Sequence, residues 1–128
     1  MEQNKLDISG IALVSVYAHN FEESFKFYNE IIGLKEFNPM GSEACYFTFG
    51  KNGGMYLIGG HHKFDFPEKI VRTTFAFEVF STLAMFNHLV LNNILTIQSE
   101  PMKMNTQVSW FQCYDPSGNI LEFCGGIS

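Results

Sequence analysis

The spacing of hydrophobic residues changes from strand-like to helix-like within the first quarter of the chain. Residues 8–18 are mostly apolar and rich in β-branched side chains, which is typical of a strand. In residues 21–32, aromatic and aliphatic side chains recur at helical intervals, which predicts a helix. Asn20 is suited to begin this helix and Gly33 to end it, because Asn accepts hydrogen bonds from the first turn and Gly adopts a positive φ. We therefore expect a strand that leads into a capped helix.

The same order of patterns then occurs a second time. After the helix, residues 34–37 are extended and residues 44–58 alternate as a hairpin. The second series consists of a strand at 72–79, a helix that begins at Ser81, an extended segment at 94–98 and a hairpin at 107–124. The offset is roughly sixty residues, and two copies are too few for a solenoid. The pattern predicts one domain over 1–128, made of repeats at about 8–60 and 70–126, with an α+β fold.

Alternation along the predicted strands separates two kinds of face. One face of the first strand carries the small apolar residues Val14, Val16 and Ala18, which suit packing under a helix. The other face carries Leu13, Ser15 and Tyr17. In the last hairpin, the set with polar groups is Trp110, Gln112 and Tyr114, and it alternates with Phe111 and Cys113. Because the helix-facing sets elsewhere lack polar side chains, we expect the mixed sets to face a cavity.

Composition limits the possible partners. The chain has a net charge of −5 and scattered basic residues, with Arg72 as its only arginine. Because a nucleic-acid-binding domain would present a basic patch, nucleic acid is not expected as a partner. No apolar run approaches the roughly 20 residues of a membrane span, and the N-terminus lacks a signal-peptide core, so no membrane is expected either. Cys45, Cys113 and Cys124 are odd in number and lack metal-type spacing, which favours reduced thiols in a cytoplasmic protein.

Aromatic residues are abundant, with fourteen Phe, five Tyr and one Trp. This amount of aromatic surface exceeds what a plain small core needs. It leaves two interpretations open, an aromatic-lined cavity and a core rich in Phe.

A carboxylate near the C-terminus is the strongest candidate for a functional group. Residues 115–119 are Asp-Pro-Ser-Gly-Asn, which predicts a tight turn because Pro fixes φ and Gly or Asn takes a positive φ cheaply. In the strand that returns from this turn, Glu122 lies between apolar neighbours on one face. Burying a carboxylate there is costly without a partner, so Glu122 either meets water or binds a group. Ser15 and Tyr17 are its expected partners within the protein.

Three segments resemble a known family. They are residues 20–34, with Phe-Tyr in a helix that ends at Gly-Leu, residues 74–79, and the Asp-Pro-Ser-Gly-Asn-Ile-Leu-Glu sequence of 115–122. Together they resemble the vicinal oxygen chelate superfamily, which includes glyoxalase I, extradiol dioxygenases, fosfomycin-resistance proteins and bleomycin-resistance proteins. The resemblance implies two βαβββ modules that form a curved mixed sheet around a cavity. It also implies a homodimer, since members of this superfamily are usually dimers.

The resemblance also assigns the positions of a metal site. Metal-dependent members hold a divalent ion with His, Gln or Glu side chains, typically one from each of four strands. Carried over to this chain, those positions correspond to Leu13, Tyr56, Thr74 and Glu122. Only Glu122 is a good ligand, because Leu has no donor atom and Thr is a poor donor. We therefore expect no metal and no other cofactor, unless a rearranged site holds a divalent ion through His61 or His62.

These observations favour a binding protein that resembles the bleomycin-resistance branch and sequesters a small, partly apolar ligand. Its expected cavity is lined by Leu13, Ser15, Tyr17, Tyr56, Thr74, Trp110, Gln112 and Glu122. The alternative is an enzyme, a glyoxalase-like lyase or an extradiol-type dioxygenase, with a rearranged site that uses Glu122 and a histidine. In that case Glu122 is the candidate catalytic residue. A third interpretation is a structural dimer without a small ligand.

Overall fold

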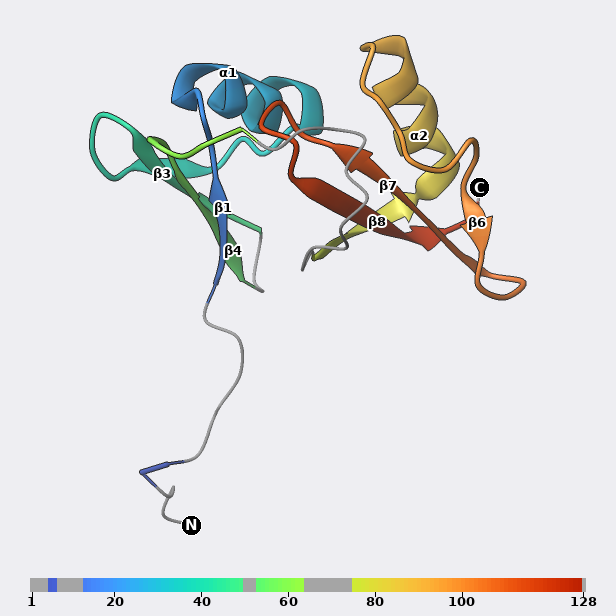
Figure 1. Cartoon of the computed structure of the whole chain (residues 1–128). Coiled ribbons are helices and arrows are strands. Elements are labelled where there is room, and N and C mark those ends of the chain that lie inside the picture. The colour runs from blue at the N-terminus through green and yellow to red at the C-terminus, as the bar shows by residue number, and fades with distance from the viewer. Residues whose placement is uncertain (1–4, 7–12, 50–52, 64–74, 128) are drawn as a thin grey trace.

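The computed structural model describes residues 5–6, 13–49, 53–63 and 75–127 (Figure 1). In the first half the elements are β1 (Val14–Tyr17), α1 (Phe21–Lys26), the π-helical segment η1 (Phe27–Ile32), β2 (Phe37–Pro39), β3 (Ala44–Thr48) and β4 (Gly54–Ile58). In the second half they are β5 (Ala76–Ser81), α2 (Thr82–Leu91), β6 (Met102–Lys103), β7 (Val108–Tyr114) and β8 (Ile120–Gly126). The ends of the expected repeats near residues 8 and 70 lie outside the described residues.

The strands form two four-stranded mixed sheets with the same topology. The order is β1-β4-β3-β2 in the first sheet and β5-β8-β7-β6 in the second. β1 runs parallel to its neighbour β4, and β5 runs parallel to its neighbour β8. The remaining neighbouring strands are antiparallel. Figure 1 shows α1 next to the first sheet and α2 next to the second. This is the expected α+β fold of two βαβββ modules. The single curved sheet of the prediction is instead two sheets, since no strand pairing joins them within the described residues.

The two hairpins have the same register. Their ladders end at the pairs Thr48–Gly54 and Tyr114–Ile120, so five residues connect the two strands in each hairpin. Tyr56 of β4 and Glu122 of β8 lie within these ladders, each two residues after the first paired residue of its strand. These two residues are therefore structurally equivalent.

The predicted helix caps are confirmed. The Asn20 side-chain oxygen accepts a hydrogen bond from the Glu23 backbone N–H at 3.1 Å, and the Ser81 hydroxyl accepts one from Ala84 N–H at 3.0 Å. Gly33 ends the first helix with a φ of 95°. That helix is α-helical only to Lys26 and then widens into the π-helical segment η1, a change that hydrophobic spacing did not predict.

Two extended segments differ from the sequence prediction. The segment expected at 34–37 pairs as a strand over 37–39 and includes Pro39, which the edge position of β2 tolerates because one side of the strand needs no hydrogen-bonded neighbour. The segment expected at 94–98 makes only an isolated bridge between Thr96 and Cys113. The regular edge strand of the second sheet is β6, a few residues later.

Phe residues supply much of the core between the sheets and their helices. The large side chains with no exposed surface are Tyr28, Phe47, Met55, Leu57, Leu89, Phe111, Leu121 and Phe123. Phe111 stacks on Phe123 with 5.1 Å between ring centroids. Across the two modules, Phe49 contacts Phe77 edge-to-face at 5.4 Å. Of the two interpretations of the high Phe content, the core is the one that these contacts support.

The described residues contain no helix that is both long enough and apolar enough to span a bilayer.

Candidate ligand-binding site

Each sheet has one face covered by its helix and one face that we call the open face. In the first sheet, Val16 and Ala18 are buried at 4% and 0% exposure under the helix. Leu13 and Tyr17 are exposed at 39% and 44%, and Ser15 between them is exposed as well. The predicted alternation of the first strand is therefore confirmed, and its mixed set lies on the open face.

The second sheet shows the same division. The helix-facing side chains have no exposed surface, and they are Phe111, Cys113, Leu121 and Phe123. Trp110, Gln112 and Glu122 are half-buried on the opposite face, as predicted. Tyr114 differs from the prediction, because at the end of β7 it is buried at 7% exposure instead of lining the open face.

Glu122 ends a chain of side-chain amides on the open face. Gln112 donates from its side-chain Nε2 to Glu122 Oε1 at 3.2 Å. Gln98 holds Gln112 in turn, because Gln98 Oε1 accepts the Gln112 backbone N–H at 2.6 Å and Gln98 Nε2 donates to Gln112 Oε1 at 3.1 Å. The side-chain carbonyl oxygen of Gln112 thus accepts a hydrogen bond from Gln98, and this orients the Gln112 NH₂ group toward the Glu122 carboxylate.

Gln98 was missed from the sequence. It lies on the irregular segment before β6, and that segment was treated only as an extended connection. A polar residue four positions before a sheet edge carries no local signal, since its contact with Gln112 depends on the path of the loop.

The protein partner of Glu122 is Gln112, whereas the sequence suggested Ser15 and Tyr17. Tyr17 instead packs against the ring of His61, with 4.5 Å between centroids. Within the described residues, no Lys, Arg or His lies within ion-pair distance of the Glu122 carboxylate.

The four positions that correspond to metal ligands in the superfamily do not supply a matching donor set. The structure describes three of these positions, Leu13, Tyr56 and Glu122, and Leu13 has no donor atom. The fourth, Thr74, lies outside the described residues. In the described part of the chain, no three His, Cys, Asp or Glu side chains are grouped so that they could hold a metal ion. Of the three described positions, only Glu122 carries a side chain that commonly binds a divalent ion.

A second polar cluster lies where the turn of the second hairpin meets the first module. Asp115 is only 2% exposed, and its carboxylate accepts four hydrogen bonds. The donors are the backbone N–H groups of Ser117 and Asn119 at 2.9 and 2.8 Å, the Asn119 side chain at 2.9 Å and the Tyr28 hydroxyl at 2.6 Å. Tyr28 belongs to η1, so this carboxylate joins the two modules.

Burial dominates the titration of this cluster. It raises the pKa of Asp115, although the hydrogen bonds from Tyr28 and Asn119 lower it in part. Burial also raises the pKa of Tyr28 well above 10.0, and the neighbouring Asp115 charge adds to that shift. The Tyr28 hydroxyl therefore keeps its proton at neutral pH and donates a hydrogen bond to Asp115.

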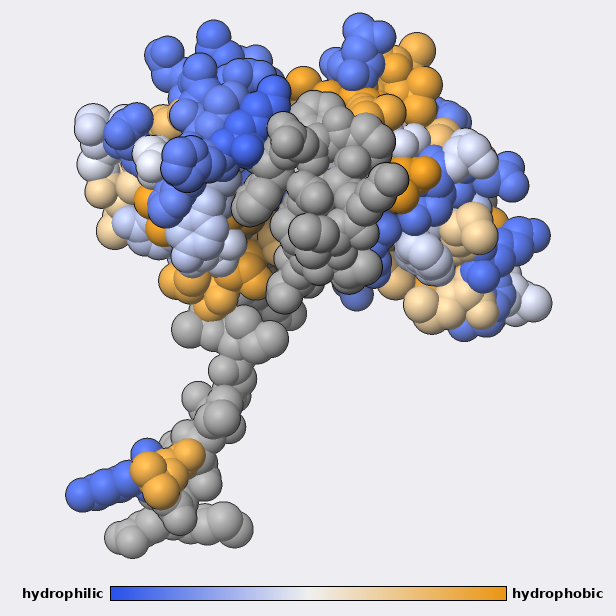
Figure 2. Space-filling view, viewed as in Figure 1, coloured by the Kyte–Doolittle hydropathy of each residue, from blue (hydrophilic) through white to orange (hydrophobic). Residues whose placement is uncertain are grey.

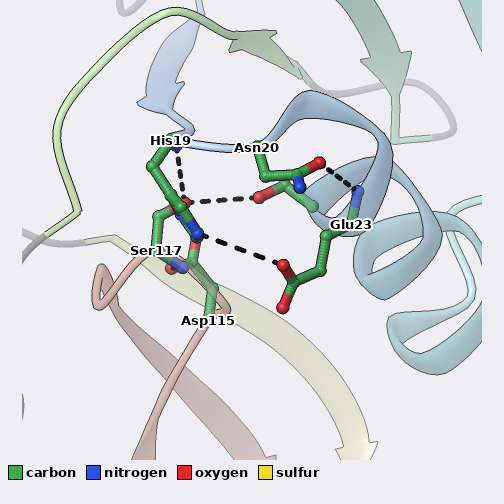
Figure 3. Close-up of polar contacts among 6 residues, drawn as sticks. His19, Asn20, Glu23, Asp115 and Ser117 are labelled. Atoms are coloured by element: carbon green, nitrogen blue, oxygen red, sulfur yellow. Dashed lines mark hydrogen bonds and ion pairs between the residues drawn. The ribbon is translucent and has the colours of Figure 1, made fainter.

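Next to this carboxylate, His19, Glu23 and Ser117 have the composition of a hydrolytic triad (Figure 3). His19 Nδ1 lies 2.8 Å from the Ser117 hydroxyl, and His19 Nε2 lies 4.0 Å from Glu23 Oε2. The same hydroxyl accepts the His19 backbone N–H at 2.9 Å. Because Ser117 has no exposed surface, it cannot attack a substrate. The trio instead fastens the end of β1 to the turn between β7 and β8.

Three grooves are walled by described residues. A groove of about 500 Å³ lies between Leu83 and Met102, one of about 350 Å³ lies beside Phe80 and His88, and one of about 220 Å³ lies between Phe27 and Tyr114. None of the eight residues named for the expected cavity borders any of these three grooves, whereas Tyr114, which was expected on the same face as Trp110 and Gln112, borders the groove beside Phe27. An enclosed cavity at the open faces stays a prediction.

Comparisons with known proteins agree with this architecture. Neither protein-family models nor curated protein sequences match the chain. Among solved structures, a Bacillus anthracis protein assigned to the glyoxalase family is 29% identical with a TM-score of 0.71, and the match covers 96% of this chain and 99% of that chain. A glyoxalase/dioxygenase from Nostoc punctiforme is 14% identical with a TM-score of 0.78 and coverages of 100% and 98%. A genomically encoded fosfomycin resistance protein from Listeria monocytogenes is 14% identical with a TM-score of 0.74, and both coverages are 94%.

The chain therefore has the fold of the vicinal oxygen chelate superfamily, and the resemblance inferred from its motifs is confirmed. Its neighbours within that fold are glyoxalase-like, dioxygenase-like and fosfomycin-resistance proteins. One fold supports many activities, so the function of this chain has to be argued from its own side chains.

Proposed function

We propose that this protein binds a small, partly apolar molecule on the open faces of its sheets and sequesters it without chemical change. The divalent metal of the superfamily's metal-dependent members takes no part in this function. The expected site combines Leu13, Ser15, Tyr17 and Tyr56 of the first module with Trp110, Gln112 and Glu122 of the second, and Thr74 completes it.

The observation that carries the proposal is the position and orientation of the Glu122 carboxylate. Its carboxylate is oriented by Gln112 on a half-buried surface, next to aromatic and aliphatic side chains. Tyr56 occupies the equivalent position of the first module. Leu13, directly before β1, occupies a position where metal-dependent members carry a ligand. This combination supports recognition by hydrogen bonding and apolar contact better than it supports metal chemistry.

Metal analysis of the purified protein tests the metal-free part of the proposal. We expect less than stoichiometric Zn²⁺, Mn²⁺ or Ni²⁺ after dialysis against each ion, with the same result for Glu122→Gln. One ion per chain that is lost in Glu122→Gln would contradict the proposal.

Thermal-shift screening of small aromatic and aliphatic compounds then tests ligand binding. A complete absence of hits at the open face would contradict the binding function itself.

The alternative function is that of a glyoxalase-like lyase or an extradiol-type dioxygenase. Its supporting observation is His61, whose ring contacts Tyr17 at a tilted angle and so lies beside the open face of the first sheet. In such an enzyme, Glu122 and His61 would act in a rearranged site. Turnover of a hemithioacetal or a catechol by the wild type, abolished in Glu122→Gln and in His61→Ala, would establish this alternative.

We further propose that two copies associate and that the protein resides in the cytoplasm. Figure 2 shows hydrophobic side chains gathered over α2, whereas the surface over α1 is mostly hydrophilic. The exposed apolar residues in and beside α2 are Phe80 at 97%, Leu83 at 46%, Val90 at 49% and Leu91 at 82%. Sedimentation should give a dimer mass for the wild type and a monomer mass for the double variant with Phe80→Ser and Leu91→Ser.

The three free cysteines support the proposed location in the cytoplasm, which is a reducing compartment. Burial raises the pKa of the Cys113 thiol to about 12.

A further inference from the structure

The open face of the second sheet presents hydrogen-bond acceptors at one end and an aromatic surface at the other. Gln112 pairs with Glu122 across β7 and β8, and Trp110 is the next residue of β7 on the same face. Met102 of β6 pairs with Trp110 in the ladder, so its side chain leaves the sheet on the same face as the indole. In a ladder of this kind the diagonal neighbours Trp110 and Glu122 are about 7–8 Å apart, which lets one small molecule contact both.

The polar end accepts hydrogen bonds and offers few. The Gln112 amide is committed, because its oxygen is held by Gln98 and its NH₂ group points to Glu122 Oε1. An ionised carboxylate has about four acceptor sites, and the described residues fill one of them at Glu122. A ligand that fits this end must therefore supply hydrogen-bond donors.

The charges on this face further limit which ligands can bind. Glu78 lies on the same open face, because it pairs with Cys124 of β8, two residues beyond Glu122. No basic side chain of the described residues offsets the Glu122 carboxylate, and the whole chain carries a net charge of −5. An anionic ligand would meet repulsion here, and a neutral ligand would leave the carboxylate uncompensated when it excludes water.

We infer that the ligand is an organic cation, an ammonium or guanidinium group on an aromatic or aliphatic body. The cationic group binds Glu122, and the body lies on Trp110 and Met102. The inference rests on the proposed binding function and specifies its ligand class. Both contacts favour a cation, since the carboxylate forms a charge-assisted hydrogen bond and the indole face attracts positive charge.

The sole tryptophan of the chain makes the test direct, because Trp110 fluorescence reports on this face alone. Three probes of matched shape are titrated: phenethylammonium, the neutral phenethyl alcohol and the anionic phenylpropanoate. We expect phenethylammonium to change the fluorescence saturably, at least about tenfold more tightly than the alcohol, with no response to phenylpropanoate. Binding should weaken as salt is added, because part of the attraction is electrostatic.

Two variants assign the effect. Glu122→Gln keeps the shape and removes the charge, so it should weaken phenethylammonium binding at least about tenfold while it leaves binding of the alcohol unchanged. Glu43→Gln changes an exposed carboxylate in the loop between β2 and β3 and should leave both affinities unchanged.

The possible failures are distinguishable. Equal or tighter binding of the alcohol or of phenylpropanoate overturns the cation inference and leaves the binding function standing. Tight binding of a divalent metal at Glu122, with no response to phenethylammonium, overturns both the inference and the metal-free proposal. No response to any probe, together with no hit in the thermal-shift screen, overturns the binding function and the inference with it.

Discussion

The two hairpins of this protein share a backbone and differ in side-chain chemistry. Equivalent positions on their open faces hold Tyr46 and Tyr56 in β3 and β4, and Gln112 and Glu122 in β7 and β8. The helix-facing positions are apolar in both hairpins except Ser109, which is buried and hydrogen-bonded to Thr82 of α2. The duplicated backbone therefore depends on its buried residues, while its open faces are free to acquire different chemistry.

The turns differ as sharply as the faces. Residues 49–53 and 115–119 have the same length, and Phe49 stands where the second turn has Asp115. Phe49 contributes an aromatic contact to Phe77 of the other module, whereas Asp115 contributes four buried hydrogen bonds. Each turn thus connects its module to the other, one by apolar packing and one by a buried carboxylate.

The largest effect is expected from Asp115→Ala. The substitution leaves the Tyr28 hydroxyl and buried backbone N–H groups without an acceptor, and each such group costs about 1–3 kcal/mol. We expect the free energy of unfolding, measured by urea denaturation, to fall by about 3 kcal/mol or more. A loss below about 1 kcal/mol would show that the carboxylate does not hold the modules together.

Tyr28→Phe should have the next largest effect and should depend on pH. It removes one hydrogen bond to a charged acceptor, worth about 1.5–3 kcal/mol at neutral pH. Because the pKa of Tyr28 is raised above 10.0 in the folded protein, this contribution is complete below pH 10 and is lost as the pH rises through the folded-state pKa. The difference between wild type and Tyr28→Phe should therefore narrow above pH 10. A constant difference across that range would contradict the raised pKa.

Glu122→Tyr makes the second hairpin resemble the first at its open face. Because Tyr56 occupies the equivalent half-buried position, we expect the free energy of unfolding to change by less than about 1 kcal/mol. Phenethylammonium binding should be lost while the circular dichroism spectrum is unchanged. Retained binding would show that Glu122 is not the group that recognises the cation.

The smallest effect is expected from Thr48→Val in the first module. The Thr48 hydroxyl donates to Glu36 at 3.1 Å, and this hydrogen bond is exposed to solvent. We expect a change within about 0.5 kcal/mol in the free energy of unfolding, which makes this variant the control for the buried contacts of Asp115. A loss comparable with that of Tyr28→Phe would remove the distinction between exposed and buried polar contacts.

Local patterns were enough to predict most of the fold. Asn20, Ser81 and Gly33 act where their side chains or φ angles suggested, because caps depend on residues within one turn. The two faces of β1 and β7 followed from period-two alternation, because that period is a property of the strand itself. The positions of Tyr56 and Glu122 were assigned through the family resemblance, and the register of the two hairpins shows that they are structurally equivalent.

Contacts between distant segments could not be predicted in the same way. Asp115 was interpreted as a turn residue, and its burial depends on Tyr28 from the other module. Gln98 reaches Gln112 only through the path of an irregular loop. Glu122 was identified correctly as a carboxylate in need of a partner, but the choice of Gln112 instead of Ser15 or Tyr17 depends on how the two sheets are placed.

The bond between Tyr28 and Asp115 also has a consequence for the order of folding. The two residues are 87 positions apart in the chain, so a ribosome that has completed the first module has not yet made the acceptor for the Tyr28 hydroxyl. Until Asp115 emerges, that hydroxyl must stay in water or enter the core unsatisfied, and such long-range contacts slow folding. The first module should therefore acquire its final packing only after the second hairpin has been synthesised and closes onto it.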